Sequence, residues 1–250
     1  MSISERRDRI VSARGATSSE FPPHVLREYA FIADGERGAL VGPRGDISWI
    51  CAPAWDSDAV FSALIGGAGA YGVTPTERFV WGGYHESRSL IWTSRWITVD
   101  GTVESRDALA APGAPGTAVI LRRIRAVDGP ARLRVVLDLR AAFGAETMRI
   151  TRHDDDVWTG RSGALRFRWS GAGSAVRRGR GPIELELTLK PGQSQDLVLE
   201  ISAGDFADPV LDPMKCWSAT ELFWRSAVPI SRGARPGPET PNTPSPCSAR

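Results

Sequence analysis

The sequence predicts an all-β protein, a large antiparallel β-sandwich, on three observations: alternating apolar residues, turn signals between the alternating runs, and no helices of the length that parallel strands need. The alternation is clearest in segments 133–139, 165–169 and 183–189. In Leu165-Arg166-Phe167-Arg168-Trp169, every second residue is apolar. Since successive side chains of a strand point to opposite faces of a sheet, we interpret each segment as a half-buried strand.

Turn signals separate neighbouring strands. Three turns and the strands that they separate are Pro43-Arg44-Gly45-Asp46 between 39–41 and 47–51, Asp100-Gly101 between 90–99 and 102–106, and Asp128-Gly129-Pro130 between 119–127 and 132–139. Asp-Gly accepts the positive φ values that tight hairpins need, so we expect three antiparallel hairpins. Strands joined in this way pack as a sandwich rather than as a parallel sheet.

Two helices interrupt the strands in this prediction. A short one over 57–65, capped by Asp56 or Ser57, ends at Gly66-Gly67. A longer one begins at Asp212-Pro213, a good cap and first-turn pair, and runs to about Ala227. Met214, Trp217, Glu221 and Trp224 share one face of this helix, so its two tryptophans need a surface to pack against.

Composition excludes several classes of function. The chain has 250 residues with 31 basic and 29 acidic side chains, a net charge of +2 that gives no reason to expect nucleic acid or an anionic membrane as a partner. No apolar run is long enough to cross a membrane, and no secretory signal follows Arg6-Arg7, so we expect a cytoplasmic protein. We find neither a glycine-rich nucleotide loop nor a serine-hydrolase triad, and we expect no cofactor.

The expected domain organisation has four parts. Residues 1–20 are polar and charged and form a disordered lead, and residues 21–206 form the β-sandwich. Residues 207–227 contain the linker helix. Residues 228–250 are rich in Pro, Gly, Ser and Thr, with almost no large apolar side chain, so we expect a disordered tail.

Residues 29–65 carry the most specific pattern. In order and spacing they contain Gly35 to Val41, Gly45-Asp46-Ile47-Ser48-Trp49, Cys51, Pro53, Asp56-Ser57 and Phe61. A later stretch runs from Trp96 to Asp107 with the sequence WITVDGTVESRD. Together these segments resemble the opening of bacterial glycoside hydrolase family 15 proteins, the glucoamylases and the related trehalases. The resemblance covers roughly residues 25–225 and weakens after about 140.

The resemblance implies a large β-sandwich, a helical linker, and then an (α/α)6 barrel that holds both catalytic glutamates and cleaves α-glucosidic bonds with inversion. Glycoside cleavage needs such an acid and base pair. Here the segment Glu221-Leu222-Phe223-Trp224-Arg225 is similar to the start of the linker, and a Pro-rich tail follows it. We therefore expect a non-catalytic domain without catalytic residues of its own, ended by a frameshift near Ala227, by a plain truncation or by a misannotated gene end.

Two further interpretations stay open: a freestanding carbohydrate-binding module, and an inert fragment. The best sugar-binding candidates are Trp49, Trp55 and Asp56, because an indole packs on the apolar face of a pyranose and a carboxylate accepts bonds from its hydroxyls. The resemblance places this turn toward the barrel, although Ala54-Trp55 replaces the family's Arg-Phe. The alternative is that Trp49 belongs to the core and Asp56 caps a helix.

No metal site is expected. The run His153-Asp154-Asp155-Asp156 is typical of a solvated turn, because adjacent acidic residues rarely converge on one ion. The expected partners are a carbohydrate, an α-glucan or trehalose, and the missing barrel. Without the barrel, an exposed apolar docking face would favour self-association.

Overall fold

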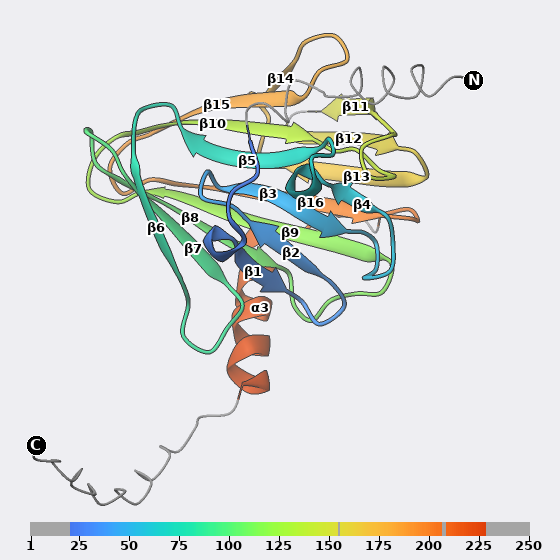
Figure 1. Cartoon of the computed structure of the whole chain (residues 1–250), viewed down its shortest axis with the longest axis horizontal. Coiled ribbons are helices and arrows are strands. Elements are labelled where there is room, and N and C mark those ends of the chain that lie inside the picture. Colours follow the sequence, from blue (N-terminus) through green and yellow to red (C-terminus); the bar gives the residue numbers. More distant parts are fainter. Residues whose placement is uncertain (1–20, 155, 207–208, 229–250) are drawn as a thin grey trace, which may run out of the picture.

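The computed structural model describes residues 21–154, 156–206 and 209–228, and within them two antiparallel eight-stranded sheets lie face to face (Figure 1). The prediction of an all-β sandwich is confirmed. The predicted disordered lead, 1–20, and the tail beyond Val228 lie outside the described residues.

The first sheet, which we call sheet A, has the strand order β1-β2-β3-β5-β10-β15-β14, and β4 pairs with β3 beside this path. Its strands are β1 (Ala30–Ala33), β2 (Gly38–Val41), β3 (Asp46–Cys51), β4 (Ala59–Phe61), β5 (Ala70–Pro75), β10 (Ala131–Asp138), β14 (Val176–Arg177) and β15 (Ile183–Leu189). A 3-10 turn, η1 (Leu26–Glu28), precedes the sheet.

The second sheet, sheet B, has the order β11-β12-β13-β16-β9-β8-β7-β6. Its strands are β6 (Val80–His85), β7 (Trp92–Ile97), β8 (Thr102–Leu109), β9 (Thr117–Ala126), β11 (Met148–Asp154), β12 (Val157–Ser162), β13 (Leu165–Ser170) and β16 (Ser194–Ser202). The chain passes between the sheets several times, so neither sheet is built from one continuous segment.

One core fills the space between the sheets. Tyr71 of sheet A and Trp96, Phe167 and Trp169 of sheet B are all fully buried in it. The alternating apolar residues of segments 133–139, 165–169 and 183–189 face this core, as predicted. The opposite faces are not all left to solvent, because Val136 is buried in a second cluster with Phe21 and Ala70, and Arg168 is buried beside Glu200. Burial of apolar surface on this scale is the main source of the sandwich's stability.

Two of the three predicted hairpins exist, and the third is wrong. β2 pairs with β3, and β7 pairs with β8. In contrast, the turn Asp128-Gly129-Pro130 joins strands of different sheets: β9 pairs with β8 and β16, whereas β10 pairs with β5 and β15. The tight turn is used here to cross from sheet B to sheet A.

The predicted short helix over 57–65 is also wrong in its first half. Residues Ala59–Phe61 form β4, and only Ala63–Ile65 form a single 3-10 turn, η2. Neither Asp56 nor Ser57 caps it, because the residue before η2 is Ser62. Gly66 ends the turn in the left-handed conformation, with φ of 77°, as the Gly66-Gly67 signal predicts.

The second helix, α3 (Pro213–Ala227), follows sheet B and is the orange-red helix at the lower edge of the sandwich in Figure 1. Asp212 caps it, as predicted, by accepting hydrogen bonds from the backbone N–H groups of Met214 and Lys215. Trp217 packs on the outer face of sheet B with Ile91, Ala108, Leu121 and Val198. None of the helices among the described residues is long and apolar enough to span a membrane.

Candidate functional site

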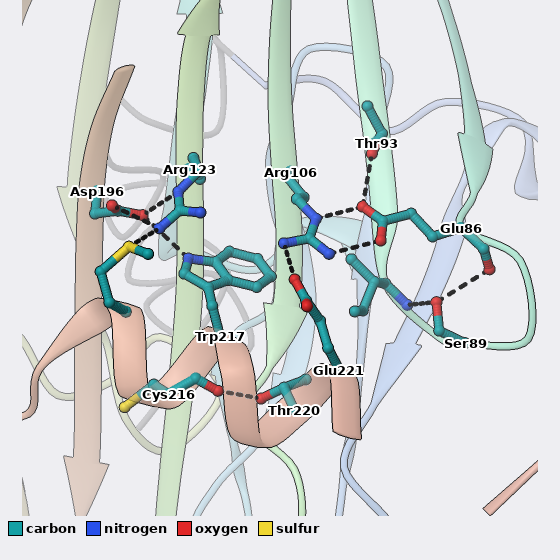
Figure 2. Close-up of polar contacts among 12 residues, drawn as sticks. Glu86, Ser89, Thr93, Arg106, Arg123, Asp196, Cys216, Trp217, Thr220 and Glu221 are labelled. Carbon is teal, nitrogen blue, oxygen red and sulfur yellow. Dashed lines mark hydrogen bonds and ion pairs between the residues drawn. The ribbon is translucent and has the colours of Figure 1, made fainter. Parts of the chain in front are cut away.

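The contact between α3 and sheet B is centred on Trp217. Its indole lies between two guanidinium groups, those of Arg106 on β8 and Arg123 on β9, at 4.4 and 5.6 Å from the ring centroid (Figure 2). The indole Nε1 donates to Oδ1 of Asp196, 3.0 Å away, and Arg123 Nε donates to the same oxygen at 2.8 Å. Apolar burial, cation–π attraction and a hydrogen bond therefore all fix this one side chain.

Arg106 joins the helix to the loop after β6. Its guanidinium contacts both carboxylate oxygens of Glu86, with Nη2 at 2.6 Å from Oε2, and its Nη1 lies 2.8 Å from Oε1 of Glu221 on α3. Burial lowers the pKa of Arg106, but its hydrogen bonds to the carboxylates of Glu86 and Glu221 and their negative charge outweigh that effect, so the pKa lies above its usual value. The carboxylates of Glu86 and Glu221 are therefore both bound to the guanidinium of Arg106.

The carboxyl end of α3 is fixed by the same loop. Arg88 donates from Nε to the Val228 carbonyl at 3.0 Å and from Nη2 to the Arg225 carbonyl at 2.8 Å. A cation at this end also complements the helix dipole. A pocket of about 350 Å³ lies between the loop and the helix, and its lining includes Glu86, Arg88, Arg106, Glu221 and Trp224. Arg88 thus ties the carboxyl end of α3 to this loop, and Asp212 caps its amino end.

The predicted sugar-binding residues lie elsewhere, on sheet A. Trp49 is half-buried on β3, opposite Leu40 of β2, which is itself opposite Phe31 of β1. Its ring lies 6.3 Å from that of Phe143. Because these strands are in register, Phe31, Leu40 and Trp49 form a row across the outer face of the sheet.

Trp55 extends this row. It is 53% exposed and stacks on Phe31 with 6.2 Å between centroids and 24° between planes. Gly38 makes room for the pair, since a Cβ there would lie 2.4 Å from Phe31 and 2.6 Å from Trp55. We call the set Phe31, Leu40, Trp49, Trp55 and Phe143 the aromatic face.

Asp56 is exposed and lines a separate pocket of about 440 Å³. Two further exposed carboxylates, those of Asp58 and Glu146, line the same pocket, together with Ala141 and Ala142. Ser57 does not cap a helix; its hydroxyl accepts from the Ala54 N–H at 3.1 Å within the turn. This pocket offers several acceptors for sugar hydroxyls.

Trp49, Trp55 and Asp56 lie in the same region of sheet A, but their side chains do not converge on one binding site. Trp49 and Asp56 both border segment 141–146, whereas Trp55 turns toward β1. The alternative that Asp56 is a helix cap is wrong. Trp49 is half-buried rather than a core residue.

Sequence reasoning missed Phe31, Phe143 and the ion pairs around Arg106. A neighbouring ion pair could have been found if the strand pairing had been known, because Arg123 of β9 and Asp196 of β16 are opposite each other in the sheet register. A single sequence does not give this strand pairing.

No group of three or more metal-ligating side chains lies close enough to hold an ion in the described part of the chain. Within the His153–Asp156 run, the side chains of residues 153–155 lie outside the described residues. Asp156 accepts hydrogen bonds from the backbone N–H groups of Gly171 and Gly173, at 3.1 and 2.8 Å, and so connects two loops.

Comparison with known proteins gives one family. The profile of the family described as "Trehalase-like, N-terminal" matches residues 18–210. A trehalase of Mycobacterium tuberculosis is 35% identical over 106 residues, which are 40% of this chain and 15% of that protein. A trehalase of Mycolicibacterium smegmatis is 38% identical over 96 residues, which are 36% of this chain and 13% of that protein.

These alignments therefore cover about one seventh of the length of either trehalase. Among solved structures, a putative kojibiose phosphorylase from human microbiome superimposes with a TM-score of 0.37 and 10% sequence identity, over 79% of this chain and 32% of that one.

Proposed function

The chain belongs to the trehalase-like N-terminal family, and from this premise we propose that it is the non-catalytic β-sandwich of a family 15-type glycoside hydrolase that cleaves trehalose or an α-glucan. In this role the sandwich supports a helical catalytic barrel, which supplies the acid and the base. The observation that carries the proposal is the aromatic face, a group of exposed and half-buried rings on the outside of sheet A beside an acidic pocket.

The chemistry of the carboxylates supports a non-catalytic role. Glycoside hydrolysis needs two carboxyl groups across the scissile bond, one of them a proton donor kept in an apolar setting. Glu86 and Glu221 share a pocket, but both are bound to Arg106. Asp56, Asp58 and Glu146 share another, but all three are exposed to solvent. Neither the pocket beside α3 nor the pocket at Asp56 has a buried carboxylic acid opposite a second, unpaired carboxylate.

The aromatic face suits two tasks in such an enzyme. Exposed apolar rings grouped on one face favour burial against another protein surface, here the barrel. At its border, Trp49 and Asp56 flank segment 141–146, where an indole and a carboxylate can contact the two faces of a sugar. We therefore assign sugar contact to Trp49 and Asp56 at this border, whereas Trp55, which turns toward β1, belongs to the surface that the barrel would cover.

A binding experiment tests the support role. The purified chain is titrated calorimetrically into a family 15 catalytic barrel expressed without its own sandwich. We expect saturable binding that weakens at least tenfold for Trp55→Ala, whose ring is exposed, and that stays unchanged for Val99→Ala, which is 92% exposed and distant in sequence from the aromatic face. Equal affinity for all three proteins, or no binding, would contradict the proposal.

An activity assay tests the non-catalytic role. The chain alone is incubated with trehalose and with malto-oligosaccharides, and released glucose is measured. We expect none. Glucose release by the wild type that disappears in Asp56→Asn or Glu86→Gln would overturn the proposal and identify the pocket concerned.

A second candidate function is a freestanding carbohydrate-binding module, which the acidic pocket beside Trp49 favours. Saturable binding of trehalose or a glucan without barrel and without hydrolysis, weakened by Asp56→Asn, would support it. If the chain binds neither sugar nor barrel, the inert-fragment interpretation holds. We also propose a cytoplasmic location, which accords with free thiols at Cys51 and Cys216, and which cell fractionation tests.

A further inference from the structure

Strand β6 ends sheet B with an unprotected edge. Its sequence, Val80-Trp81-Gly82-Gly83-Tyr84-His85, contains no Asp, Glu, Lys, Arg or Pro, and five of its six residues are exposed. Figure 1 shows β6 at the left side of the sandwich, outside β7. A flat edge strand of this kind is a template for pairing with another strand, and proteins usually protect such edges with charges, prolines, bulges or short length.

The other described sheet ends have such protection. β14 has only two residues, Val176 and Arg177. β11 carries charged residues and a register shift between Ile150 and Arg152. At the edge of β1, the carbonyl oxygen of Phe31 contacts Nε2 of His85 at 2.8 Å. The unprotected edge of β6 is therefore the exception.

The hydrogen bonding of β6 to β7 determines which of its groups face outward. The Glu86 N–H donates to the Ile91 carbonyl at 2.9 Å, in continuation of the register that places His85 opposite Trp92. Because hydrogen-bonded residues alternate in an antiparallel ladder, the even-numbered residues of β6 bond to β7. The N–H and C=O groups of Trp81, Gly83 and His85 consequently point away from the sheet.

We propose that β6 pairs antiparallel with β6 of a second copy of this chain, around a two-fold axis at Gly82, so that sheet B continues through both copies. The outward-facing residues then meet one another, with Trp81 opposite Gly83 of the second copy. Gly83 has no side chain to obstruct this indole. A two-fold axis makes the contact self-complementary and closes the assembly as a dimer.

Charge favours this register. It places Arg78, which is exposed, opposite Glu86 of the second copy, so that Arg78 and Arg106 share this partly exposed carboxylate, and the two-fold axis repeats the pair. It also places Val80, 70% exposed, opposite Tyr84, 49% exposed, so two apolar pairs are covered. The neighbouring register, centred on Gly83, would place Val80 rather than Arg78 opposite Glu86 and so lose this ion pair.

A charge-exchange series tests the pairing, with molecular mass measured by light scattering after gel filtration. The wild type is expected at twice 27.0 kDa. Val80→Lys/Tyr84→Lys places two cations opposite each other at both pairs and should give the monomer. Val80→Lys/Tyr84→Glu places a cation opposite an anion at the same positions and should retain the dimer. Val99→Lys, at a 92% exposed position outside β6, should also retain it.

A cross-linking experiment tests the register. A Cβ at Gly82 meets no atom within 4 Å, so Gly82→Cys fits the fold. On the two-fold axis the two thiols belong to a non-hydrogen-bonded pair with Cα atoms about 4.5 Å apart, within disulfide range. Mild oxidation should give a covalent dimer for Gly82→Cys and none for Val80→Cys, which lies opposite Tyr84, or for the wild type with its native cysteines.

Three results would overturn the proposal. The first is a wild type that stays monomeric at the highest soluble concentration. The second is a dimer that survives Val80→Lys/Tyr84→Lys with circular dichroism unchanged. The third is equal cross-linking of Gly82→Cys and Val80→Cys. None of these readouts depends on sugar or barrel binding, so the dimer can fail while the proposed function stands.

Discussion

At the scale of single residues, the most informative side chain of the core is Arg122. It is fully buried on β9, with Nε 2.8 Å from Oδ1 of Asp107, and its Nη1 donates to the Tyr71 carbonyl of sheet A at 2.8 Å. The guanidinium therefore connects the two sheets through the core. Its burial lowers its pKa, but Asp107 outweighs that effect, so the pKa of Arg122 is raised and the guanidinium stays charged.

We predict that Arg122→Met costs about 3–5 kcal/mol of unfolding free energy, because it leaves the Asp107 carboxylate buried without a counter-charge. Urea denaturation measures the loss. Arg122→Met/Asp107→Leu should recover most of it, since removing both charges also removes the cost of their desolvation. A double variant less stable than the single one would contradict this account.

Tyr71 gives a prediction for alkaline pH. Burial raises its pKa well above the usual 10.0, although Arg122 and a hydrogen bond from Trp169 oppose the shift. The folded state thus favours the neutral phenol. Its contribution to stability is complete below about pH 10 and is lost as pH rises further, because only the unfolded chain can then ionise this residue.

In Tyr71→Phe we expect about 1 kcal/mol lower stability at pH 7, from the lost Trp169 bond, and a shallower loss above pH 10. Guanidinium denaturation between pH 7 and 11 measures both. Tyr84→Phe is the control, since this residue is 49% exposed. Identical slopes for wild type and Tyr71→Phe would contradict the prediction.

The sequence identified part of the candidate site at this scale. Trp49, Trp55 and Asp56 come from one short segment with a specific pattern, so their proximity could be predicted. Phe31 and Phe143 are 112 positions apart (143 − 31), and only strand pairing and the 141–146 segment bring them to the same face. Similarly, nothing local distinguishes Arg122, which is buried, from Arg123, which faces α3.

At the scale of elements, α3 is held mainly by one side chain. Trp217→Ala should remove about 3–5 kcal/mol of docking free energy, since it empties the position between Arg106 and Arg123. We expect faster amide hydrogen exchange over 213–227 and an unchanged rate in β10. Leu222→Ala, at a 64% exposed position of the same helix, is the matched control. Retained protection in Trp217→Ala would show that the remaining contacts, such as those of Arg106 with Glu221 and of Arg88 with the end of the helix, are enough to hold it.

An element could be predicted from the sequence where its signal is local, and not where tertiary packing decides its structure. The Asp212-Pro213 start of α3 is a local signal, and the structure uses it locally. The segment Ala59-Val60-Phe61 is fully buried and pairs with β3, so tertiary burial overrides the expected helix. At Asp128-Gly129-Pro130 the turn chemistry was predicted, but a tight turn fits equally between strands of one sheet and between two sheets.

At the scale of the whole molecule, three surfaces lie on different parts of the sandwich. The aromatic face lies outside sheet A, α3 covers the outer face of sheet B, and the β6 edge ends sheet B. Because β6 alone offers an unprotected strand edge among the described sheet ends, we assign self-association to it rather than to the aromatic face. The chain can therefore bind a catalytic barrel and form the β6 dimer at the same time.

This separation predicts a double dissociation. Trp55→Ala should weaken binding to the catalytic barrel at least tenfold and leave the dimer mass unchanged, because its ring stacks on the side chain of Phe31, whereas β6 contacts the backbone carbonyl of Phe31, through His85. Val80→Lys/Tyr84→Lys should do the reverse. Light scattering and calorimetric titration on the same three proteins, wild type included, measure both properties. If either variant changes both properties, with its circular dichroism intact, dimerisation and barrel binding use one continuous surface, and the assignment of separate roles to the two sheets fails.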